Sequence, residues 1–340
     1  MANPAEDSPL PRRGAEAAQA SVRAAAPAAL GLPRPATDAE RARARALLFA
    51  SAFFFGLSAI LVRVATRAGL EAGQVTLIRF SFGFSAVLVV FRVRPGTFRP
   101  TRPDLLAARA GFGAAAALLY FMAIQRIPAG EATLLNNTFP IWAVLIAIVL
   151  LGERPTLHLA IALAMASAGV FLVLGGGRAS FRLGSGEVIG IVSGVLGGAA
   201  VTAIRALRAT ANVPAPTVFF AFSIGGILVG LPSLLQPWTA SPVTWAAALG
   251  VAASAFLAQL TMTEAYGQLS VPEAALWQQL TPISSYVWGL ALGEGVTAST
   301  LVGILLGVGG IVYGSVLGHR ATARASPVAR AAPEIPAEEP

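Results

Sequence analysis

The stretch GEATLLNNTFPIWAVLIAIVLLGE, residues 130–153, recurs in outline as PEAALWQQLTPISSYVWGLALGE, residues 272–294. A shift of 142 residues aligns positions that two apolar segments would not match by composition alone: Glu131 with Glu273, Asn136 and Asn137 with Gln278 and Gln279, and Pro140 with Pro282. The same shift places Gly56 on Gly198 and Arg63 on Arg205. Because charged, amide and proline positions coincide, the chain is predicted to consist of two related halves.

The composition indicates a membrane protein. Of 340 residues, 56% are hydrophobic and only 12% are charged, and the mean hydropathy is +0.71. Soluble domains carry about 25% charged residues, which help to cover their surface. A chain with about half that supply, whose apolar residues come in long runs, is expected to lie mostly within a lipid bilayer.

The apolar runs divide the chain into ten segments of spanning length, since a bilayer core about 30 Å thick needs roughly 20 helical residues. The predicted spans are 46–66, 73–91, 105–125, 130–151, 156–175, 186–206, 216–235, 243–265, 273–293 and 299–318. Residues 1–45 and 319–340 have no sustained apolar run and are predicted to be disordered tails. The expected fold class is an all-α membrane protein with ten transmembrane helices.

Arginine positions set the expected orientation, because cytoplasmic loops of membrane proteins are enriched in Lys and Arg. If the N-terminus lies in the cytoplasm, thirteen Arg residues, Arg109 among them, fall on the cytoplasmic side and four on the opposite side. Ten spans then return the C-terminus to the cytoplasm. The expected location is the inner (plasma) membrane, with both tails cytoplasmic.

Each half contains five spans, an odd number, so the second half is expected to enter the membrane from the opposite side. The predicted domains are a first five-helix repeat at 46–175 and an inverted second one at 186–318. Inverted repeats are typical of secondary transporters, which bind a solute between the halves and rock one half against the other. The repeat therefore favours transport by alternating access.

Residue types that other functions need are missing. The chain has no Cys and no Lys, all 24 basic residues being Arg, so thiolate metal sites and Lys-containing phosphate loops are excluded. Its two His residues are far apart, and neither a metal nor a cofactor is expected. The net charge of +8 is attributed to topology, not to nucleic-acid binding. An intramembrane group-transfer enzyme is the alternative class, but it would need clustered His, Asp or Ser residues.

Several segments also resemble a known family. FFFGLSAILVRVA at 53–65, Arg79 early in the second span, a proline within the fourth, and LLGER at 150–154 with a second copy, ALGEG, at 291–295 resemble the EamA type of the drug/metabolite transporter superfamily. This resemblance covers 46–318. It implies ten spans, no ATP-binding domain and, in most members, export of amino acids, metabolites or toxic compounds. The chain departs from the commoner pattern at Arg63, where Lys is frequent, and at Ala221, the counterpart of Arg79.

The candidate substrate-cavity residues lie next to the two repeated prolines. A proline inside a helix removes one backbone hydrogen bond and bends the helix, so kinks are expected at Pro140 and Pro282. The freed carbonyls must face protein or a wet cavity. The predicted cavity residues are Asn136, Asn137, Trp142, Trp277, Gln278, Gln279 and Tyr286. As an alternative, the four amide side chains hold helices together by mutual hydrogen bonds.

Four charged residues within or near the ends of spans are candidates for a gate or for ion coupling, because a charge inside a membrane is costly. The hypothesis is an outer gate in which Arg79 or Arg63 pairs with Glu131, while Glu264 carries a coupling proton. The alternatives are arginines that extend to the interface, a first-turn acid at Glu131, and an exposed helix-end charge at Glu264.

The expected function is secondary active transport of a small metabolite, amino acid or drug, driven by a proton or solute gradient, with export the favoured direction. Import or exchange of a similar solute is the alternative, and the sequence leaves a homodimer open. Glycines repeat at 186, 190, 194 and 198 and again at 303, 307, 310, 314 and 318. These predict faces on which helices pack closely.

Overall fold

The computed structural model describes residues 36–127, 129–153, 155–173, 184–238, 241–290 and 298–314. Within these ranges the chain is helical apart from short connections, and no strand occurs. From residue 39 onward the described helices belong to one compact unit. Most of the predicted N-terminal tail and all of the C-terminal one lie outside the described residues.

All ten predicted segments contain helix. In the first half the helices are α2 (Asp38–Arg67), α3 (Ala72–Val93), α4 (Pro103–Arg126), α5 (Ala129–Asn136), α6 (Phe139–Leu151) and α7 (Leu157–Val173). In the second half they are α8 (Ser185–Arg205) with the π-helical turn η1 (Ala206–Thr210), α9 (Ala215–Gly230) with the 3-10 turn η2 (Leu231–Leu235), α10 (Pro242–Ala265), α11 (Val271–Gln278), α12 (Leu280–Leu290) and α13 (Ala298–Tyr313). Among the described residues, seven helical stretches are long and apolar enough to cross a membrane, and two shorter apolar ones lie in α7 and α13.

The first helix begins earlier than expected. α2 starts at Asp38, so residues 38–45, which were predicted to belong to a disordered tail, are helical. This segment consists largely of Ala, Glu and Arg, which are good helix formers, and its acids lie near the N-terminus, where the helix dipole favours them. Local propensity therefore extends the helix beyond the apolar run.

The fourth and ninth predicted spans are interrupted, which is a larger change than the expected kinks. Asn137 lies in the gap between α5 and α6, and Pro140 falls in the first turn of α6. Gln279 separates α11 from α12, and Pro282 falls in the first turn of α12. A proline is tolerated in a first helical turn because the N–H it lacks would be unpaired there in any case. Each proline therefore starts a new helix where a bend in a continuous one was predicted.

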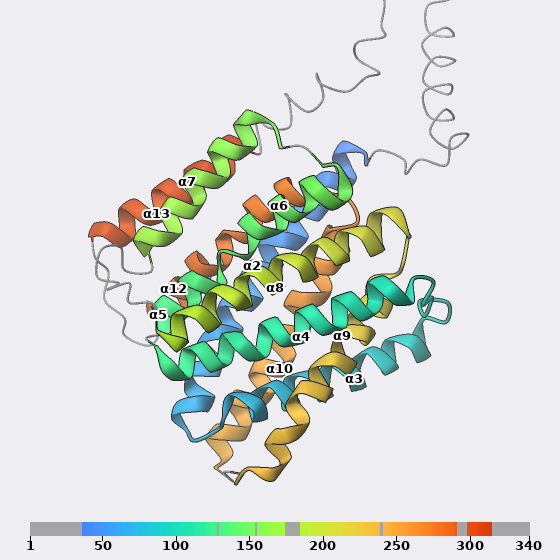
Figure 1. Cartoon of the computed structure of the whole chain (residues 1–340), viewed down its shortest axis with the longest axis vertical. Helices are drawn as coiled ribbons and strands as arrows, with labels where there is room; N and C mark the ends of the chain where they lie inside the picture. The colour runs from blue at the N-terminus through green and yellow to red at the C-terminus, as the bar shows by residue number, and fades with distance from the viewer. Residues whose placement is uncertain are drawn as a thin grey trace, which may run out of the picture. The chain divides into compact units, whose positions relative to one another are not determined.

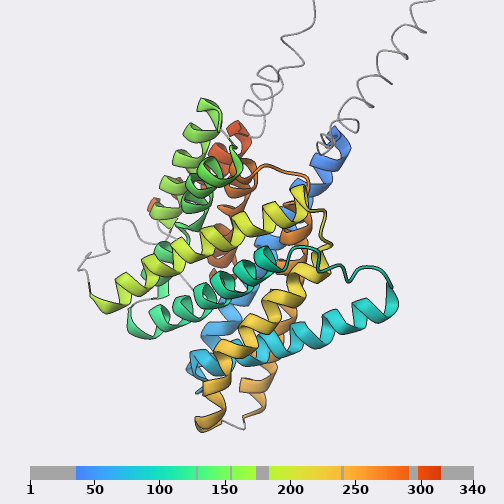
Figure 2. The same cartoon turned by 45° about the vertical axis from the view of Figure 1, so that its right-hand side comes forward.

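Helices of the two halves pack against each other. α4 lies along α8, α3 along α9 and α7 along α13 (Figure 1). A view turned by 45° keeps α4 beside α8 and α3 beside α9 (Figure 2). Two of these pairs, α3 with α9 and α7 with α13, join equivalent helices of the repeat. The halves are therefore in contact along much of their length.

Glycines allow the closest of these approaches. A Cβ atom on Gly198 of α8 would overlap the backbone of Ala143 in α6, and a Cβ atom on Gly56 of α2 would overlap the backbone of Ser285 in α12. Gly56 corresponds to Gly198, and Ala143 to Ser285, under the same 142-residue shift. The sequence repeat is therefore also a repeat of packing.

The predicted glycine faces are packing faces in the structure. Gly190 and Gly194 of α8 face Leu135 at the end of α5, with too little room for a side chain. On α13, Gly310 lies against the backbone of α7 at Ala162 and Ala166. Small residues bring helix backbones together in a membrane, where helix association relies on packing.

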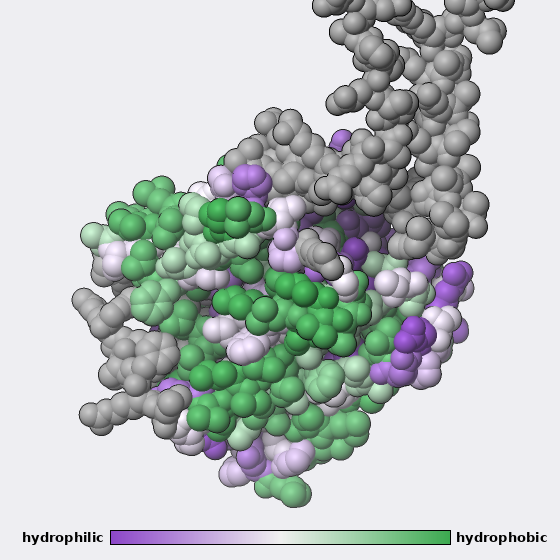
Figure 3. Space-filling model, turned by 45° about the horizontal axis from the view of Figure 1, so that its top comes forward, coloured by the Kyte–Doolittle hydropathy of each residue, from purple (hydrophilic) through white to green (hydrophobic). Residues whose placement is uncertain are grey.

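The outer surface of the helices is apolar. Val149, Leu157, Leu235 and Leu305 each have 74% or more of their surface exposed. Figure 3 shows apolar residues over most of the visible helical face, with hydrophilic residues gathered towards its edges. An exposed apolar surface of this extent marks a region that contacts another protein or a membrane, and a lipid bilayer shields it from water. The chain is a multi-pass membrane protein.

Candidate functional site

A cavity of about 190 Å³ lies between the two halves. Its lining comes from α2, α3, α4, the break between α5 and α6, and α8 through α12. No described residue of α7 or α13 belongs to the lining. A protein cavity of about 150 Å³ can hold benzene, so this one has room for a small organic molecule.

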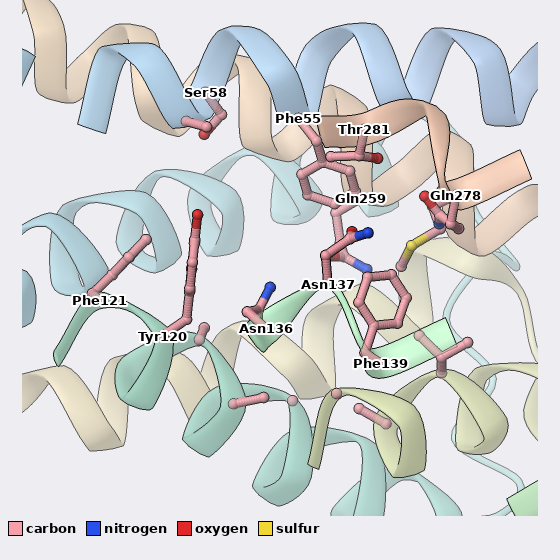
Figure 4. A pocket seen from close by; sticks show the side chains of 18 of the residues that line it. Phe55, Ser58, Tyr120, Phe121, Asn136, Asn137, Phe139, Gln259, Gln278 and Thr281 are labelled. Carbon is pink, nitrogen blue, oxygen red and sulfur yellow. The ribbon is translucent and has the colours of Figure 1, made fainter. Parts of the chain in front are cut away.

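The broken helices bring polar side chains to the cavity. Asn136 and Asn137 extend into it from the break between α5 and α6, and Gln278 and Thr281 approach from the break between α11 and α12 (Figure 4). Gln259 of α10 also lines the cavity. An interruption turns side chains of a spanning helix toward the interior, and in a membrane such irregular backbone is tolerated where it lines a cavity or is buried in protein.

Hydrogen bonds hold part of this polar set in place. The Asn137 Nδ2 donates to Oε1 of Gln279 at 2.7 Å, and the Gln279 Nε2 donates to the hydroxyl of Ser167 on α7 at 3.0 Å. The hydroxyl of Ser193 on α8 donates to Oδ1 of Asn136 at 2.6 Å. Asn137 and Gln279 thus connect the two breaks directly, as the helix-linking alternative anticipated.

The other amides have free hydrogen-bonding capacity. Gln278 is 1% exposed and lies within hydrogen-bonding range of the Tyr266 hydroxyl, although its amide makes no hydrogen bond of full geometry with a described residue. Nε2 of Gln259 and Oγ1 of Thr281 have no hydrogen-bond partner within the described part of the chain. Buried polar atoms are nearly always hydrogen-bonded, so these three side chains are candidates to bind a solute in the cavity.

Two contacts join residues that the repeat makes equivalent. Asn137 and Gln279, 142 positions apart, share the hydrogen bond described above. Phe80 and Phe222, separated by the same interval, meet edge to face with ring centroids 4.7 Å apart. In a two-fold arrangement a residue can touch its own equivalent only on the axis. Since Asn137 and Phe222 both line the cavity, the cavity lies on the pseudo-two-fold axis.

Two arginines, Arg79 of α3 and Arg109 of α4, also line the cavity. The guanidinium carbon of Arg79 lies 5.1 Å from the centre of the Phe80 ring, and that of Arg109 lies 3.7 Å from the centre of the Phe222 ring. Arg109 is only 3% exposed. These two cations therefore flank the pair of phenylalanines on the axis.

Some of the predicted cavity residues line this cavity and others do not. Asn136, Asn137, Gln278 and Pro282 are part of the lining. Gln279 lies behind Asn137 and is 1% exposed. Outside the lining are Trp142, which packs at Gly198 and donates its indole N–H to Thr138, and also Trp277, Tyr286 and Pro140.

The predicted gate residues are not gathered at one place. Arg79 faces the cavity, whereas Arg63 is outside its lining. The side chain of Glu131 lies outside the described residues, so the predicted pair with Arg79 or Arg63 stays a prediction. The carboxylate of Glu264 accepts a hydrogen bond from Arg208 at 2.7 Å, is 44% exposed, and is not part of the lining. This placement favours the alternative of an exposed helix-end charge.

Arg109 is the main site residue that the sequence reasoning missed. It was counted among the arginines of the cytoplasmic side. α4 begins at Pro103, so Arg109 lies six residues, roughly 9 Å, inside the helix. That depth is comparable to that of Arg79 in α3. Counting depth from a helix start at Pro103 would have identified Arg109 as well.

Comparison with known proteins agrees with this geometry. The model of the EamA-like transporter family matches the chain twice, over residues 43–175 and 184–315, one match for each half. The chain belongs to the EamA-like transporter family. It is accordingly a transporter and not an enzyme.

Relatives of this EamA-like chain include named exporters. It is 25% identical to the pseudopaline exporter CntI of Pseudomonas aeruginosa, over 75% of this chain and 90% of that one. It is 30% identical to an uncharacterized transporter of Archaeoglobus fulgidus, over 77% of this chain and 94% of the relative. It is 29% identical to the "probable terminal-alkyne amino-acid exporter" of Streptantibioticus cattleyicolor, over 72% of this chain and 82% of the relative. A crystal structure with 21% identity has the same fold, with a TM-score of 0.69 over 82% of this chain and 98% of its own.

The bond between Asn137 and Gln279 is expected to stabilise the contact between the two breaks. Asn137→Ala and Gln279→Ala should each lower the free energy of unfolding by about 1–2 kcal/mol, because each leaves a buried amide without its partner. The double variant should lose less than the sum of the two. Denaturant unfolding of the purified protein in detergent measures all three. Thr261→Ala, which removes a hydroxyl bonded only within its own helix, is the control. Additive losses would contradict a direct coupling.

Proposed function

We propose that this EamA-like protein is a ten-span secondary transporter of the inner membrane, built from two inverted five-helix repeats at 46–175 and 186–318. It moves a small metabolite, amino acid or drug outward by alternating access, driven by a proton or solute gradient. Both termini lie in the cytoplasm. The observation that carries the proposal is the cavity on the pseudo-two-fold axis, lined from both halves.

A chain of polar contacts between the halves supports alternating access. Arg45 of α2 pairs with Glu273 of α11 at 2.6 Å. Two residues before Glu273, the backbone N–H of Val271 donates to Glu153 at 2.7 Å, and Glu153 also pairs with Arg205 of α8 at 2.8 Å. Under the proposed topology all of these groups lie at the cytoplasmic end.

These contacts tie the first half to the second at one end of the cavity. Arg45 and Glu153 belong to the first repeat, while Glu273, Val271 and Arg205 belong to the second. A rocking motion that opens the cavity to the cytoplasm must separate them. Ion pairs of this kind hold one state and can be exchanged for water in the other, so they serve as the cytoplasmic gate in this proposal.

Export is the direction that the named relatives support, since two of them are described as exporters, one of pseudopaline and one of a terminal-alkyne amino acid. The identity is at or below 30% in these comparisons. The proposal therefore names a class of small solute and a direction of transport, and not one particular substrate. Import or exchange is the second candidate, and a flux assay separates it from export.

Flux through the cavity tests the proposal. Cells that contain the chain should hold less of an exported metabolite, or tolerate more of a toxic analogue, than cells without it, and proteoliposomes should show gradient-dependent flux. Gly197→Leu, which places a larger side chain in the cavity lining, should abolish both effects. Gly111→Leu on α4 faces open space and should leave them intact. A folded protein that moves none of the tested classes would refute transport, and uptake without efflux would support import.

A further inference from the structure

We propose that the transported solute carries a carboxylate, and that Arg79 and Arg109 bind this group together in the cavity. This inference rests on the proposed transport function and narrows it to one chemical class of substrate. It follows from the charges that line the cavity and from their placement around the axis.

Among the described residues, no acidic side chain balances the positive charge of the cavity. Within the described part of the chain, no Asp or Glu lines the cavity, and neither Arg79 nor Arg109 forms an ion pair. Nε of Arg109 has no hydrogen-bond partner among these residues. Charged groups within a membrane almost always pair with an opposite charge or mark a solute pathway. Two such groups facing one cavity call for an anion from outside the protein.

The aromatic residues hold the guanidinium groups in place. Arg109 lies over the ring of Phe222 and Arg79 near that of Phe80, while the two rings contact each other. A cation over a ring face is attracted more strongly when it is shielded from water. Nε of Arg109, without a partner among the described residues, can then donate to a planar oxyanion.

The charge comes from only one half. Under the repeat, Arg79 corresponds to Ala221 and Arg109 to Val251, and neither counterpart carries a charge. The second half contributes neutral polar groups instead, Gln278, Gln259 and Thr281. A bound solute is therefore oriented, with its carboxylate toward α3 and α4 and its uncharged part toward α10, α11 and α12.

The remaining lining defines the rest of the solute. Phe55, Phe121, Phe139 and Met262 supply apolar surface, which suits a hydrocarbon or aromatic portion. Since no described acidic residue lines the cavity, a primary amine without a carboxylate has no counter-charge there and should be excluded. The volume of about 190 Å³ limits the solute to a small one in this state.

Binding to the purified protein in detergent tests the inference without relying on transport. The probes are hexanoate, 3-phenylpropionate and L-phenylalanine, each beside its amide and a primary amine of similar size (hexylamine, 3-phenylpropylamine and 2-phenylethylamine), together with phenyl phosphate. Ligand binding raises the unfolding temperature by mass action. At least one acid should stabilise the wild type while its amide and amine do not.

Matched variants connect this preference to the two arginines. Arg79→Gln and Arg109→Gln should each weaken acid binding about 10- to 100-fold, the range for loss of a hydrogen bond to a charged group. Arg79→Lys should retain part of the affinity, and it serves as the second variant if Arg79→Gln fails to fold. Arg102→Gln, at an exposed ion pair outside the cavity, should bind acids as the wild type does.

Four outcomes would overturn the inference: amides that bind as tightly as acids, acids that bind equally well to Arg79→Gln and Arg109→Gln, tighter binding of phenyl phosphate than of any acid, or no binding of any acid. Flux of the same probes in proteoliposomes distinguishes failure of the proposed transport function from failure of the proposed carboxylate site. Flux without a preference for acids would retain transport and refute the carboxylate site. Acid binding without any flux would retain the site and refute transport.

Discussion

Leucine in place of Gly198 is expected to remove most of the folded protein from the membrane, and leucine in place of Gly56 should do the same. At each position even a Cβ atom would overlap the backbone of the facing helix, at Ala143 and at Ser285 respectively. A backbone cannot move aside as a flexible side chain can, so the helices must separate. The expected loss is about 3 kcal/mol or more, measured as folded yield by size-exclusion chromatography and as unfolding temperature in detergent.

The equivalence of the two positions is the stronger part of this prediction. Gly56 and Gly198 make the same contact in opposite halves, so their substitutions should cause losses of similar size. Gly309→Leu is the matched control, because α13 presents this glycine to open space, and its yield should equal that of the wild type. Loss at one of the two positions alone would show that packing does not follow the sequence repeat.

Replacing Glu153 by Gln should open the cytoplasmic end of the cavity. The carboxylate of Glu153 joins Arg205 to the start of α11 at Val271, and an amide cannot bind both as strongly. The side chains of Arg205 and Glu153 are 20% and 18% exposed, so their ion pair is mostly shielded from water. The expected cost of the substitution to the closed state is about 1–3 kcal/mol. Such a cost shifts the population of the two states by about 5- to 150-fold.

The absence of cysteine from the chain makes this shift directly measurable. Ser285→Cys places a single thiol in the cavity lining, and a membrane-impermeant maleimide in inside-out vesicles reports access from the cytoplasm. Glu153→Gln should raise the labelling rate by the factor given above. Asp104→Asn removes an exposed ion pair with Arg102 at the same proposed end, where such pairs are worth little, and should leave the rate unchanged. An unchanged rate in Glu153→Gln would exclude this contact as a gate.

Much of the helical layout was predictable from residue order. Helices need a continuous apolar run to cross lipid, and such runs are visible in the composition of each segment. Residues 243–265, for example, were predicted as a helix and α10 covers Pro242–Ala265. Beyond the apolar runs, prediction was poorer: α2 extends back to Asp38, and the two proline segments are broken where bends were expected.

The candidate site was predictable only where the repeat marked it. Asn136, Asn137 and Gln278 were identified because they precede repeated prolines, and all three line the cavity. Trp142 and Trp277 lie equally close in sequence but are not part of the lining. Proximity in sequence does not fix the direction of a side chain across a helix break, because each break rotates the following helix by an amount that local residues do not determine.

The sequence by itself determined that the chain is a membrane protein of two related halves, because apolar length and repeated charged, amide and proline positions are properties of residue order. Only the tertiary structure decided which polar groups share one cavity. Arg79 and Arg109 lie 30 positions apart on different helices, and their common cavity depends on how α3 and α4 pack against the second half. The positive character of the cavity arises from that packing, since a charge acts on a solute through its distance in space and the surrounding dielectric.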